Sequence, residues 1–186
     1  MRIIGGDYRS KKLFLPKNQK TRPLRDLVKE SIFNLIDHSK KININLKNSL
    51  VLDLFSGSGS FGIECLSRKA KKVMFLENNQ EALEILEKNL KLLKDISSYK
   101  IIKDDFFEYF DLKRKVQFKF DIIFIDPPYK ELRINKIIDI IKKQEILNKN
   151  GVIVIHRHKK DNIKLTDKIN IVENRNYGIS NIFFIK

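Results

Sequence analysis

The residues with the clearest chemical potential are Asp126-Pro127-Pro128-Tyr129, which directly follow an apolar run at 120–125. Proline fixes its own φ, lacks an N–H and forces the preceding residue out of the helical region, so this backbone is stiff and extended. The carbonyls of Asp126 and Pro127, together with the Asp126 carboxylate, can accept hydrogen bonds from a planar amino group. Tyr129 can stack on the ring that bears this amine. We interpret these four residues as catalytic; a strand terminator without chemistry is the alternative.

A second cluster is rich in glycine. Three of the seven glycines fall in Gly57-Ser58-Gly59-Ser60-Phe61-Gly62, between a buried strand and a helix. Glycine lets such a turn tighten and lets a ligand lie against the backbone, and the helix N-terminus offers N–H donors. Glu77, at the end of the next strand, can accept hydrogen bonds from ribose hydroxyls. This spacing is shared by sites for NAD and for S-adenosylmethionine (SAM), and by purely structural turns.

Asp53 favours SAM over NAD. It ends the strand before the glycine cluster, where its charge would repel a pyrophosphate but suit the cationic amino group of a methionine moiety. A turn residue without a ligand is the alternative. Because ligands of parallel sheets bind at the carboxyl ends of strands, both motifs are expected to face one crevice. Together they predict an enzyme that methylates an amine, with SAM as methyl donor.

The elements that must position these residues alternate between strand and helix, which is typical of a parallel α/β sheet. We expect strands at 50–54, 73–77, 99–103, 120–125, 151–156, 169–174 and 179–185, and helices at 60–68, 81–94, 106–112 and 134–147. The last two strands are separated by Arg175-Asn176-Tyr177-Gly178 rather than by a helix, so they form a hairpin. The predicted fold is a mostly parallel seven-stranded sheet with an antiparallel C-terminal strand.

Residues 1–40 precede this core and carry ten basic and four acidic residues. Runs at 2–8 and 11–15 predict a small β-hairpin, and a helix follows Thr21-Arg22-Pro23. We therefore divide the chain into a basic hairpin–helix extension (1–40) that binds RNA and a methyltransferase domain (41–186). A solvated basic face is the alternative reading of the extension. The candidate RNA-binding residues are Arg9, Lys11, Arg22 and Arg25.

The charge of the whole chain indicates a polyanionic partner. The 186 residues include 38 Lys and Arg against 23 Asp and Glu, which gives a net charge of +15. Such an excess attracts nucleic acid, although a lysine-rich composition alone would also produce it. No apolar run exceeds four residues, which excludes a membrane span and a secretory signal, so we expect a cytoplasmic protein.

Metal and disulfide chemistry are not expected. The single cysteine, Cys65, excludes a disulfide framework and a cysteine-based metal site. Of the three histidines, His156 and His158 are two apart on a strand and His38 is remote, so they lack the spacing of metal ligands. We therefore expect SAM as the methyl donor and no metal.

Almost the whole chain resembles the RsmD family, the 16S rRNA guanine-N2 methyltransferases, which are class I SAM-dependent enzymes with a Rossmann-like fold. The segments that carry the resemblance are 1–6 (MRIIGG), 22–33 (RPLRDLVKESIF), 53–59 (DLFSGSG), 126–129 (DPPY) and 177–178 (YG). The Asp-Pro-Pro-Tyr motif also occurs in DNA adenine methylases, whereas the block at 22–33 is more specific. One segment departs from the pattern: His156-Arg157-His158 follows the fifth strand, where the family leads us to expect acidic residues.

The resemblance implies a role for each matching residue. The cofactor-binding set runs from the methionine end of SAM to its adenine: Asp53, Phe55, Ser56, Gly57, Ser58, Gly59, Glu77, Asn78, Asp105 and Phe106. In this set Glu77 would hold the ribose, and Asp105 with the Phe106 backbone would read the adenine; Asp104 is the competing choice. Asp126, Pro127 and Tyr129 would hold the target guanine.

The resemblance also implies the partner, 16S rRNA within an assembling small ribosomal subunit, and a monomeric enzyme without a membrane. Three rival functions share part of the pattern. A DNA adenine-N6 methyltransferase has the same two motifs, but such enzymes usually carry a sizeable target-recognition insertion, for which this chain has no room. A NAD-dependent oxidoreductase would leave the Asp126 motif unused. A non-catalytic RNA-binding protein would bind no SAM.

Overall fold

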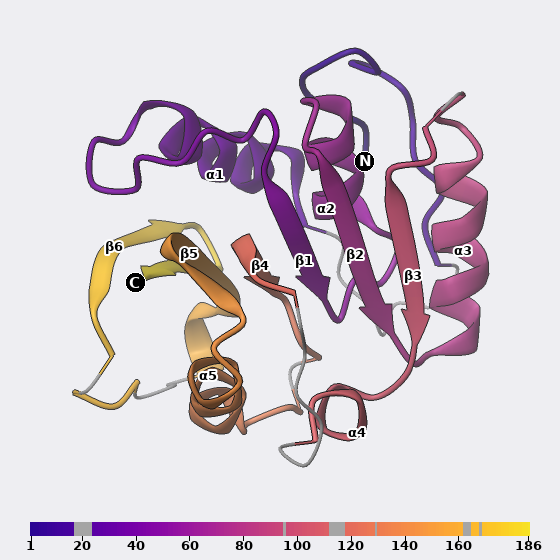
Figure 1. Cartoon of the computed structure of the whole chain (residues 1–186). Coiled ribbons are helices and arrows are strands. Elements are labelled where there is room, and N and C mark those ends of the chain that lie inside the picture. Colours follow the sequence, from indigo (N-terminus) through magenta and orange to yellow (C-terminus); the bar gives the residue numbers. More distant parts are fainter. Residues whose placement is uncertain (17–23, 95, 112–117, 129, 162–164, 168) are drawn as a thin grey trace.

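The computed structural model describes residues 1–16, 24–94, 96–111, 118–128, 130–161, 165–167 and 169–186. Within them, seven strands form one sheet in the order β3-β2-β1-β4-β5-β7-β6 (Figure 1). The strands are β1 (Leu50–Leu54), β2 (Lys72–Glu77), β3 (Tyr99–Lys103), β4 (Phe120–Ile125), β5 (Leu147–His158), β6 (Ile171–Tyr177) and β7 (Ser180–Ile185). The predicted mostly parallel seven-stranded sheet is confirmed.

Neighbouring strands are parallel except for the two pairs that include β7. β1 pairs in parallel with β2 and β4, β2 with β3, and β4 with β5. β7 is antiparallel to both β5 and β6. Only Gly178 and Ile179 separate β6 from β7, and a connection this short joins antiparallel strands alone. Gly178 adopts a left-handed φ of +59°, which glycine tolerates in a tight turn.

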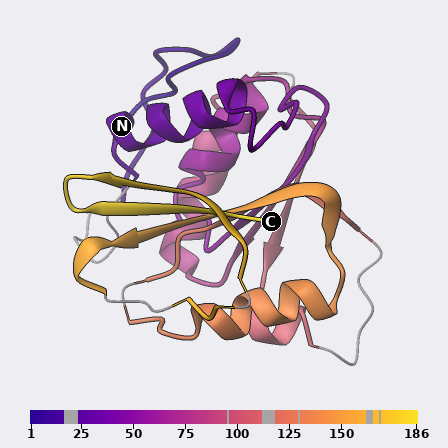
Figure 2. The ribbon, with the colours of Figure 1, turned by 90° about the vertical axis from the view of Figure 1, so that its left-hand side faces the viewer.

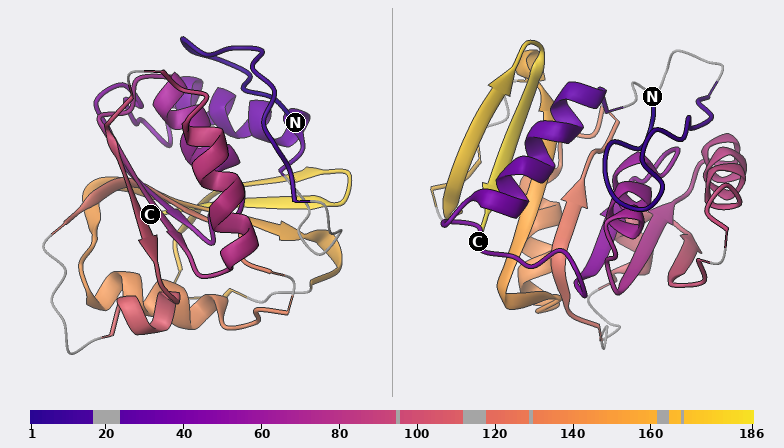
Figure 3. Two further views of the ribbon diagram at one scale, coloured as in Figure 1. Left: turned by 90° about the vertical axis from the view of Figure 1, so that its right-hand side faces the viewer. Right: turned by 90° about the horizontal axis from the view of Figure 1, so that it is seen from above.

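Helices cover both faces of the sheet. They are α1 (Asp26–His38), α2 (Ser60–Ser67), α3 (Gln80–Leu90), α4 (Phe106–Tyr109) and α5 (Ile134–Lys143), with a short 3₁₀ helix, η1 (Lys159–Asp161), after β5. Successive strand residues face opposite sides, so the sheet contributes to two buried clusters. α1, α2 and α3 pack on the face that carries Val51 and Phe75 (Figure 2). α4 and α5 pack on the face that carries Leu52 and Leu76 (Figure 3).

The largest difference from the predicted elements lies before β5. The helix predicted at 134–147 ends at Lys143, and β5 begins at Leu147 instead of Gly151. Leu147 pairs with Phe120 of β4, and a register shift separates this pair from the regular ladder that follows. The apolar Leu147 thus extends the strand rather than the helix because β4 offers it a partner.

The hairpin predicted at the N-terminus is reduced to one isolated antiparallel bridge, between Arg2 and Lys12. The backbone N–H groups of Ile4 and Gly5 donate to the Glu64 carboxylate of α2, at 2.7 Å each. The Ile3 N–H donates to the Lys11 carbonyl at 2.9 Å, and the Leu13 N–H donates to the Met1 carbonyl at 3.1 Å. The two arms therefore pair only around this bridge, and the chain then bonds to α2.

A buried ion pair joins the extension to the core. Lys29 of α1 and Glu64 of α2 are fully buried, with 3.5 Å between Nζ and Oε2. Burial lowers the pKa of Lys29, and the neighbouring Glu64 charge opposes this shift. Ile3 and Val28 belong to the same buried cluster as Val51 of β1. Residues 1–40 and 41–186 thus contribute to one core, and the separate RNA-binding role of the extension stays a prediction.

Candidate active site

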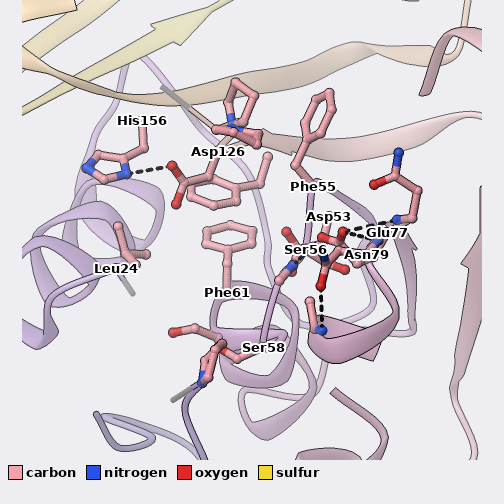
Figure 4. A pocket seen from close by; sticks show the side chains of 18 of the residues that line it. Leu24, Asp53, Phe55, Ser56, Ser58, Phe61, Glu77, Asn79, Asp126 and His156 are labelled. Carbon is pink, nitrogen blue, oxygen red and sulfur yellow. Dashed lines mark hydrogen bonds and ion pairs between the residues drawn. The ribbon is translucent and has the colours of Figure 1, made fainter. Parts of the chain in front are cut away.

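A cavity of about 340 Å³ opens at the carboxyl ends of β1, β2 and β4 (Figure 4). Ligands of parallel α/β sheets bind at this edge, and the volume is in the range of small-molecule sites. Asp53, residues 55–58, Glu77 and Asn78 line it on what we call the β2 side. Asp126, Pro127 and Pro128 line the opposite, β4 side. The two sequence motifs thus meet in one crevice.

Asp53 lies on the β2 side and is 1% exposed. Its Oδ2 accepts a hydrogen bond from the Gly62 N–H of α2 at 2.9 Å. Burial raises the pKa of the Asp53 carboxyl well above its ordinary value; the Gly62 N–H opposes this shift, and the charges of Asp126 and Glu77 add to it. A cationic group beside Asp53 would restore its charged form, so the position suits an ammonium ligand.

Glu77 organises the chain around the end of β2. Its Oε2 accepts from the Gly57 N–H at 2.8 Å, and its Oε1 accepts from the N–H groups of Asn78 at 3.0 Å and Asn79 at 2.8 Å. A carboxylate has about four lone-pair sites. Oε2 can therefore accept one further hydrogen bond from a hydroxyl group in the cavity, as the predicted contact with a ribose requires.

The glycine loop needs left-handed backbone at three positions, with φ of +56° at Phe55, +54° at Gly57 and +79° at Gly59. A Cβ at Gly59 would lie 2.3 Å from Cδ1 of Leu86 in α3, so a larger residue would push that side chain aside and would also strain the left-handed backbone. Ser56 has a buried hydroxyl without a hydrogen-bond partner among the described residues. Buried polar groups are normally paired, which indicates that a ligand in the cavity completes the site.

Asn89 of α3 is fully buried and holds the glycine loop through hydrogen bonds. Its Nδ2 donates to the carbonyls of Ser58 at 2.9 Å and Phe14 at 3.1 Å, and its Oδ1 accepts from the Phe14 N–H at 2.7 Å. The glycine loop and the N-terminal segment are thus joined through one amide. Nothing in the helical pattern of 81–94 distinguishes this residue, and sequence analysis did not identify it.

On the β4 side, the Asp126 side chain is 26% exposed and lies beside His156 of β5. Asp126 Oδ1 is 2.9 Å from His156 Nδ1, and His156 Nε2 is 2.9 Å from the Ser180 hydroxyl of β7. Burial by itself would lower the pKa of His156, but the charge and hydrogen bond of Asp126 outweigh burial, and the pKa is raised. Hydrogen bonds at both ring nitrogens fix the orientation of the imidazole.

The sequence suggested that the carbonyls of Asp126 and Pro127 can accept from a ligand, but the Pro127 carbonyl already accepts from Arg157, as does the Pro128 carbonyl. Nη1 of Arg157 donates to the carbonyls of Pro127 at 3.2 Å and Pro128 at 3.3 Å, while Nη2 lies 3.0 Å from Oδ2 of Asp161. A guanidinium presents several donors in a fixed fork, so it can hold both carbonyls at once. The Pro127 carbonyl retains one lone pair for a ligand.

Sequence analysis assigned no role to His156 and Arg157, which the structure places in the cavity lining, in contact with Asp126 and Pro127. Both belong to the segment in which the chain departs from the RsmD pattern, so the departure itself was the available signal. Ser180, two residues after Gly178, gave no signal, because its contact with His156 exists only once β5 and β7 are paired.

Asp105 and Phe106 do not line the cavity. Asp105 caps α4, since its Oδ1 accepts from the Phe107 N–H at 2.8 Å, and its Oδ2 accepts from Nδ2 of Asn78 at 3.3 Å. Asp104 Oδ1 accepts from the Asp105 N–H. Asp105 is therefore the residue of the two that connects to the cavity, through Asn78. Its contact with adenine stays a prediction.

Three of the four predicted RNA-binding residues, Arg9, Lys11 and Arg25, are described by the structure and are not among the residues that line the cavity. Arg9, Lys11 and Arg25 are exposed. Lys11 Nζ donates to the Leu92 carbonyl at 2.6 Å, which fixes the Lys11 side chain beside the end of α3. Arg22 and the predicted stacking residue Tyr129 lie outside the described residues.

Two negative findings apply to the part of the chain that the structure describes. It contains no group of three or more His, Cys, Asp and Glu side chains that could hold a metal ion. None of its helices combines the length and the apolar character that a membrane crossing requires.

Comparison with known proteins assigns the family. The model of the family described as conserved hypothetical protein 95, which is the RsmD family, matches residues 1–186. The chain belongs to the RsmD family. A relative from Haemophilus influenzae, ribosomal RNA small subunit methyltransferase D, is 32% identical over 96% of this chain and 90% of its own length.

Solved structures confirm the Rossmann-like methyltransferase fold. A Haemophilus influenzae protein superposes with a TM-score of 0.76 at 30% identity, over 100% of this chain and 97% of that one. The protein SMU.776, solved in complex with S-adenosylhomocysteine, has a TM-score of 0.64 at 20% identity, over 87% of this chain and 50% of that one. At the lower identity the likeness shows the fold alone.

Proposed function

We propose that this protein transfers a methyl group from SAM to the exocyclic N2 amine of a guanine in small-subunit rRNA. The observation that carries the proposal is the Asp126 carboxylate, which lines the cavity with Oδ1 held by His156 (Figure 4). Among the described residues Oδ2 has no partner, so it can accept from an amine. The same cavity contains Glu77 and the buried Asp53, which suit a nucleoside with a cationic amino-acid tail.

The residues of the β2 side fit SAM. Asp53 would face the ammonium group of SAM, and the Ser56 hydroxyl would face its polar methionine tail. Glu77 Oε2 would accept a hydrogen bond from a ribose hydroxyl. SAM bound there would supply a methyl group carried by a sulfonium. When an amine nitrogen takes the methyl group, the sulfur is left as a neutral thioether. The relative named as a methyltransferase supports SAM over NAD as the ligand.

Asp126 would act on the acceptor amine. The exocyclic amine of guanine is a weak nucleophile because its lone pair is conjugated with the ring. Hydrogen bonds from its N–H groups to the Asp126 carboxylate and the Pro127 carbonyl aim the lone pair and stabilise the positive charge that develops on nitrogen. Once the N–C bond has formed, the nitrogen is cationic and acidic, so it releases its proton to the Asp126 carboxylate or to solvent, and Asp126 need not be a strong base.

The other residues of the β4 side position the target. Arg157 holds the carbonyls of Pro127 and Pro128, so the acceptor atoms are fixed before a base arrives. The base must leave its stack to enter the cavity, and Tyr129 would replace the lost stacking, which is worth ~1–3 kcal/mol per base.

Ribosomal RNA is the proposed partner on grounds of charge and kinship. The net charge of +15 favours a polyanion, and the exposed Arg9, Lys11 and Arg25 of the extension would contact its phosphates. The relative from Haemophilus influenzae is named for small-subunit rRNA. A DNA adenine-N6 methyltransferase would use the same Asp126 chemistry, but the relatives do not favour it.

The test is transfer of labelled methyl groups from SAM to unmethylated small-subunit particles, free rRNA and duplex DNA, with the products digested to nucleosides. We expect N2-methylguanosine in the digest of an rRNA substrate. The substrate that is methylated faster, free rRNA or the small-subunit particle, is the form that the enzyme prefers. N6-methyladenine in DNA would move the assignment to the alternative. Failure of the wild-type protein to bind SAM would contradict both assignments. Isothermal titration calorimetry measures this binding directly.

A further inference from the structure

Three side chains from three strands form one hydrogen-bonded chain on the β4 side. It runs from Asp126, after β4, through the His156 ring of β5 to the Ser180 hydroxyl of β7, with 2.9 Å at each contact. His156 is 9% and Ser180 6% exposed, whereas Asp126 is open to the cavity. A buried hydroxyl and a buried imidazole thus support the carboxylate to which the proposed function assigns the target amine.

We propose that His156 is a positioning residue of the methyl-transfer site, which holds the Asp126 carboxylate so that Oδ2 is presented to the acceptor amine, with Ser180 fixing the ring. The inference rests on the proposed function, because it assigns how that site is oriented. Both ring nitrogens of His156 are engaged by Asp126 and Ser180, so in this role it acts through Asp126 and not through a hydrogen bond of its own to the donor or the target.

The physical need for such a residue follows from the aspartate side chain. The final torsion of a carboxylate is broad and nearly two-fold, so Asp126 by itself would present either oxygen over a range of angles. One hydrogen bond from a fixed donor selects a single orientation. The imidazole is such a donor, because Ser180 binds its second nitrogen and the surrounding strands bury it.

The protonation state of the ring then affects the reaction. Asp126, at the end of β4, and Asp161, in η1, favour the cationic ring, whereas Arg157 of β5 opposes it; Ser180 of β7 carries no charge. Nδ1 donates to Asp126 in the cation and in one neutral tautomer alike. A cation behind Asp126 disfavours the positive charge that develops on the amine. We therefore expect the neutral ring to be the more active form.

Two isosteric substitutions separate positioning from packing. His156→Asn places an amide donor near the position of Nδ1 and keeps the bond to Asp126. His156→Gln extends its amide to the position of Nε2 and keeps the contact with Ser180 alone. His38→Asn, at an exposed histidine in the last turn of α1, is the matched control. Thermal melts and SAM titrations verify that each variant is folded and binds the donor.

The readouts are kcat and KM for rRNA between pH 5.5 and about pH 9, an interval that extends to both sides of the ordinary histidine pKa of about 6.5. In wild type and His38→Asn, kcat should rise with pH through the raised pKa of His156. His156→Asn should keep kcat within about threefold at high pH and lose this rise, and His156→Gln should lower kcat roughly tenfold to a hundredfold at unchanged SAM affinity. A rise that persists in His156→Asn, or equal kcat in His156→Asn and His156→Gln, would overturn the proposal.

A measurement without turnover keeps this inference distinct from the proposed function. Titration of the histidine ring signals by NMR should show one ring whose pKa lies above the ordinary value and falls in Asp126→Asn. If wild type methylates no RNA, the proposed function fails, whereas the pairing is still decided by this titration. If the ring pKa is the same in wild type and Asp126→Asn, the pairing is absent and the inference fails.

Discussion

The two sides of the cavity are held in place by different parts of the chain. On the β2 side, carboxylates are bound by main-chain N–H groups nearby in sequence: Gly62 is nine residues from Asp53, and Gly57 is twenty from Glu77. On the β4 side, the acceptor atoms are held by side chains thirty residues away, since both His156–Asp126 and Arg157–Pro127 have this separation.

This difference fits the two proposed roles of the cavity, donor binding on the β2 side and target binding on the β4 side. Main-chain donors do not change when side chains are substituted, so the β2 side keeps one geometry as long as its turn forms, which suits a constant donor molecule. A side chain that holds an acceptor atom can be replaced by one substitution while the others stay unchanged. They suit the side that adapts to a particular target, and the departure at His156-Arg157-His158 falls on that side.

The largest effect should come from removing the acceptor on the β4 side. We expect Asp126→Asn to lower kcat by about 10²–10³, because one stabilising contact to developing charge is lost. SAM affinity should change less than about threefold, since the proposed donor site is on the other side. Single-turnover methyl transfer and calorimetry measure the two quantities, with the exposed Asp139→Asn of α5 as control. Normal turnover in Asp126→Asn would remove this mechanism.

The corresponding change on the β2 side should act on donor binding. Glu77→Gln loses a charge that accepts three main-chain N–H bonds, and we expect SAM affinity to fall roughly tenfold to a hundredfold. The KM for rRNA should stay unchanged. Glu84→Gln, on the exposed side of α3, is the matched control. An effect on the KM for RNA alone would reverse the assignment of the two sides.

Arg157→Lys tests whether the fork geometry holds the β4 side. Lysine keeps the charge but cannot reach two carbonyls and Asp161 in one plane. We expect kcat/KM for rRNA to fall about tenfold while SAM affinity is unchanged. The measurement is steady-state methylation of the same RNA. Retention of full activity would show that charge alone is sufficient.

Asp53→Asn should weaken SAM binding and stabilise the free protein. Since folding raises the pKa of Asp53 above its ordinary 3.8, the stability associated with its protonated form is present below that value and lost as pH rises through the folded pKa. The variant removes this loss, so its Tm should exceed that of wild type by a few degrees at neutral pH, at about 2–4 °C per kcal/mol, and match it in acid. Melts at several pH values check the sign.

The smallest effect concerns stability on the β4 side. Folding raises the pKa of His156 above 6.5, so its ion pair with Asp126 stabilises the fold fully below that pH, and this contribution is lost as pH rises through the folded pKa. His156→Asn should lack this dependence. We expect a difference of only a few degrees in Tm between the two proteins at pH 6, and none at pH 9. A difference that grows with pH would contradict the pairing.

The sequence predicted the turn and the strand ends of the β2 side because their determinants are local. The spacing of Gly57, Gly59 and Gly62 after an apolar strand already requires a tight turn before a helix, and Glu77 ends the next strand of the same unit. The adjacent prolines likewise marked the Asp126 motif. The antiparallel placement of β7 followed from the short connection at Gly178.

The supports of the β4 side could not be predicted in the same way. Arg157 meets Pro127, and His156 meets Ser180, only after β4, β5 and β7 have paired in their registers. The N-terminal hairpin pairs over only a few residues for a related reason, since the N–H groups of Ile4 and Gly5 donate to Glu64 of α2.

The sequence by itself determined the alternating strands and helices, the sharp glycine turn and the stiff acceptor motif, because these depend on backbone preferences over a few residues. Only the tertiary structure decided which side chains fix Asp126 and the proline carbonyls. Those contacts join residues that are remote in the chain, and a hydrogen bond forms only where the packing of the sheet brings its two partners to within about 3 Å.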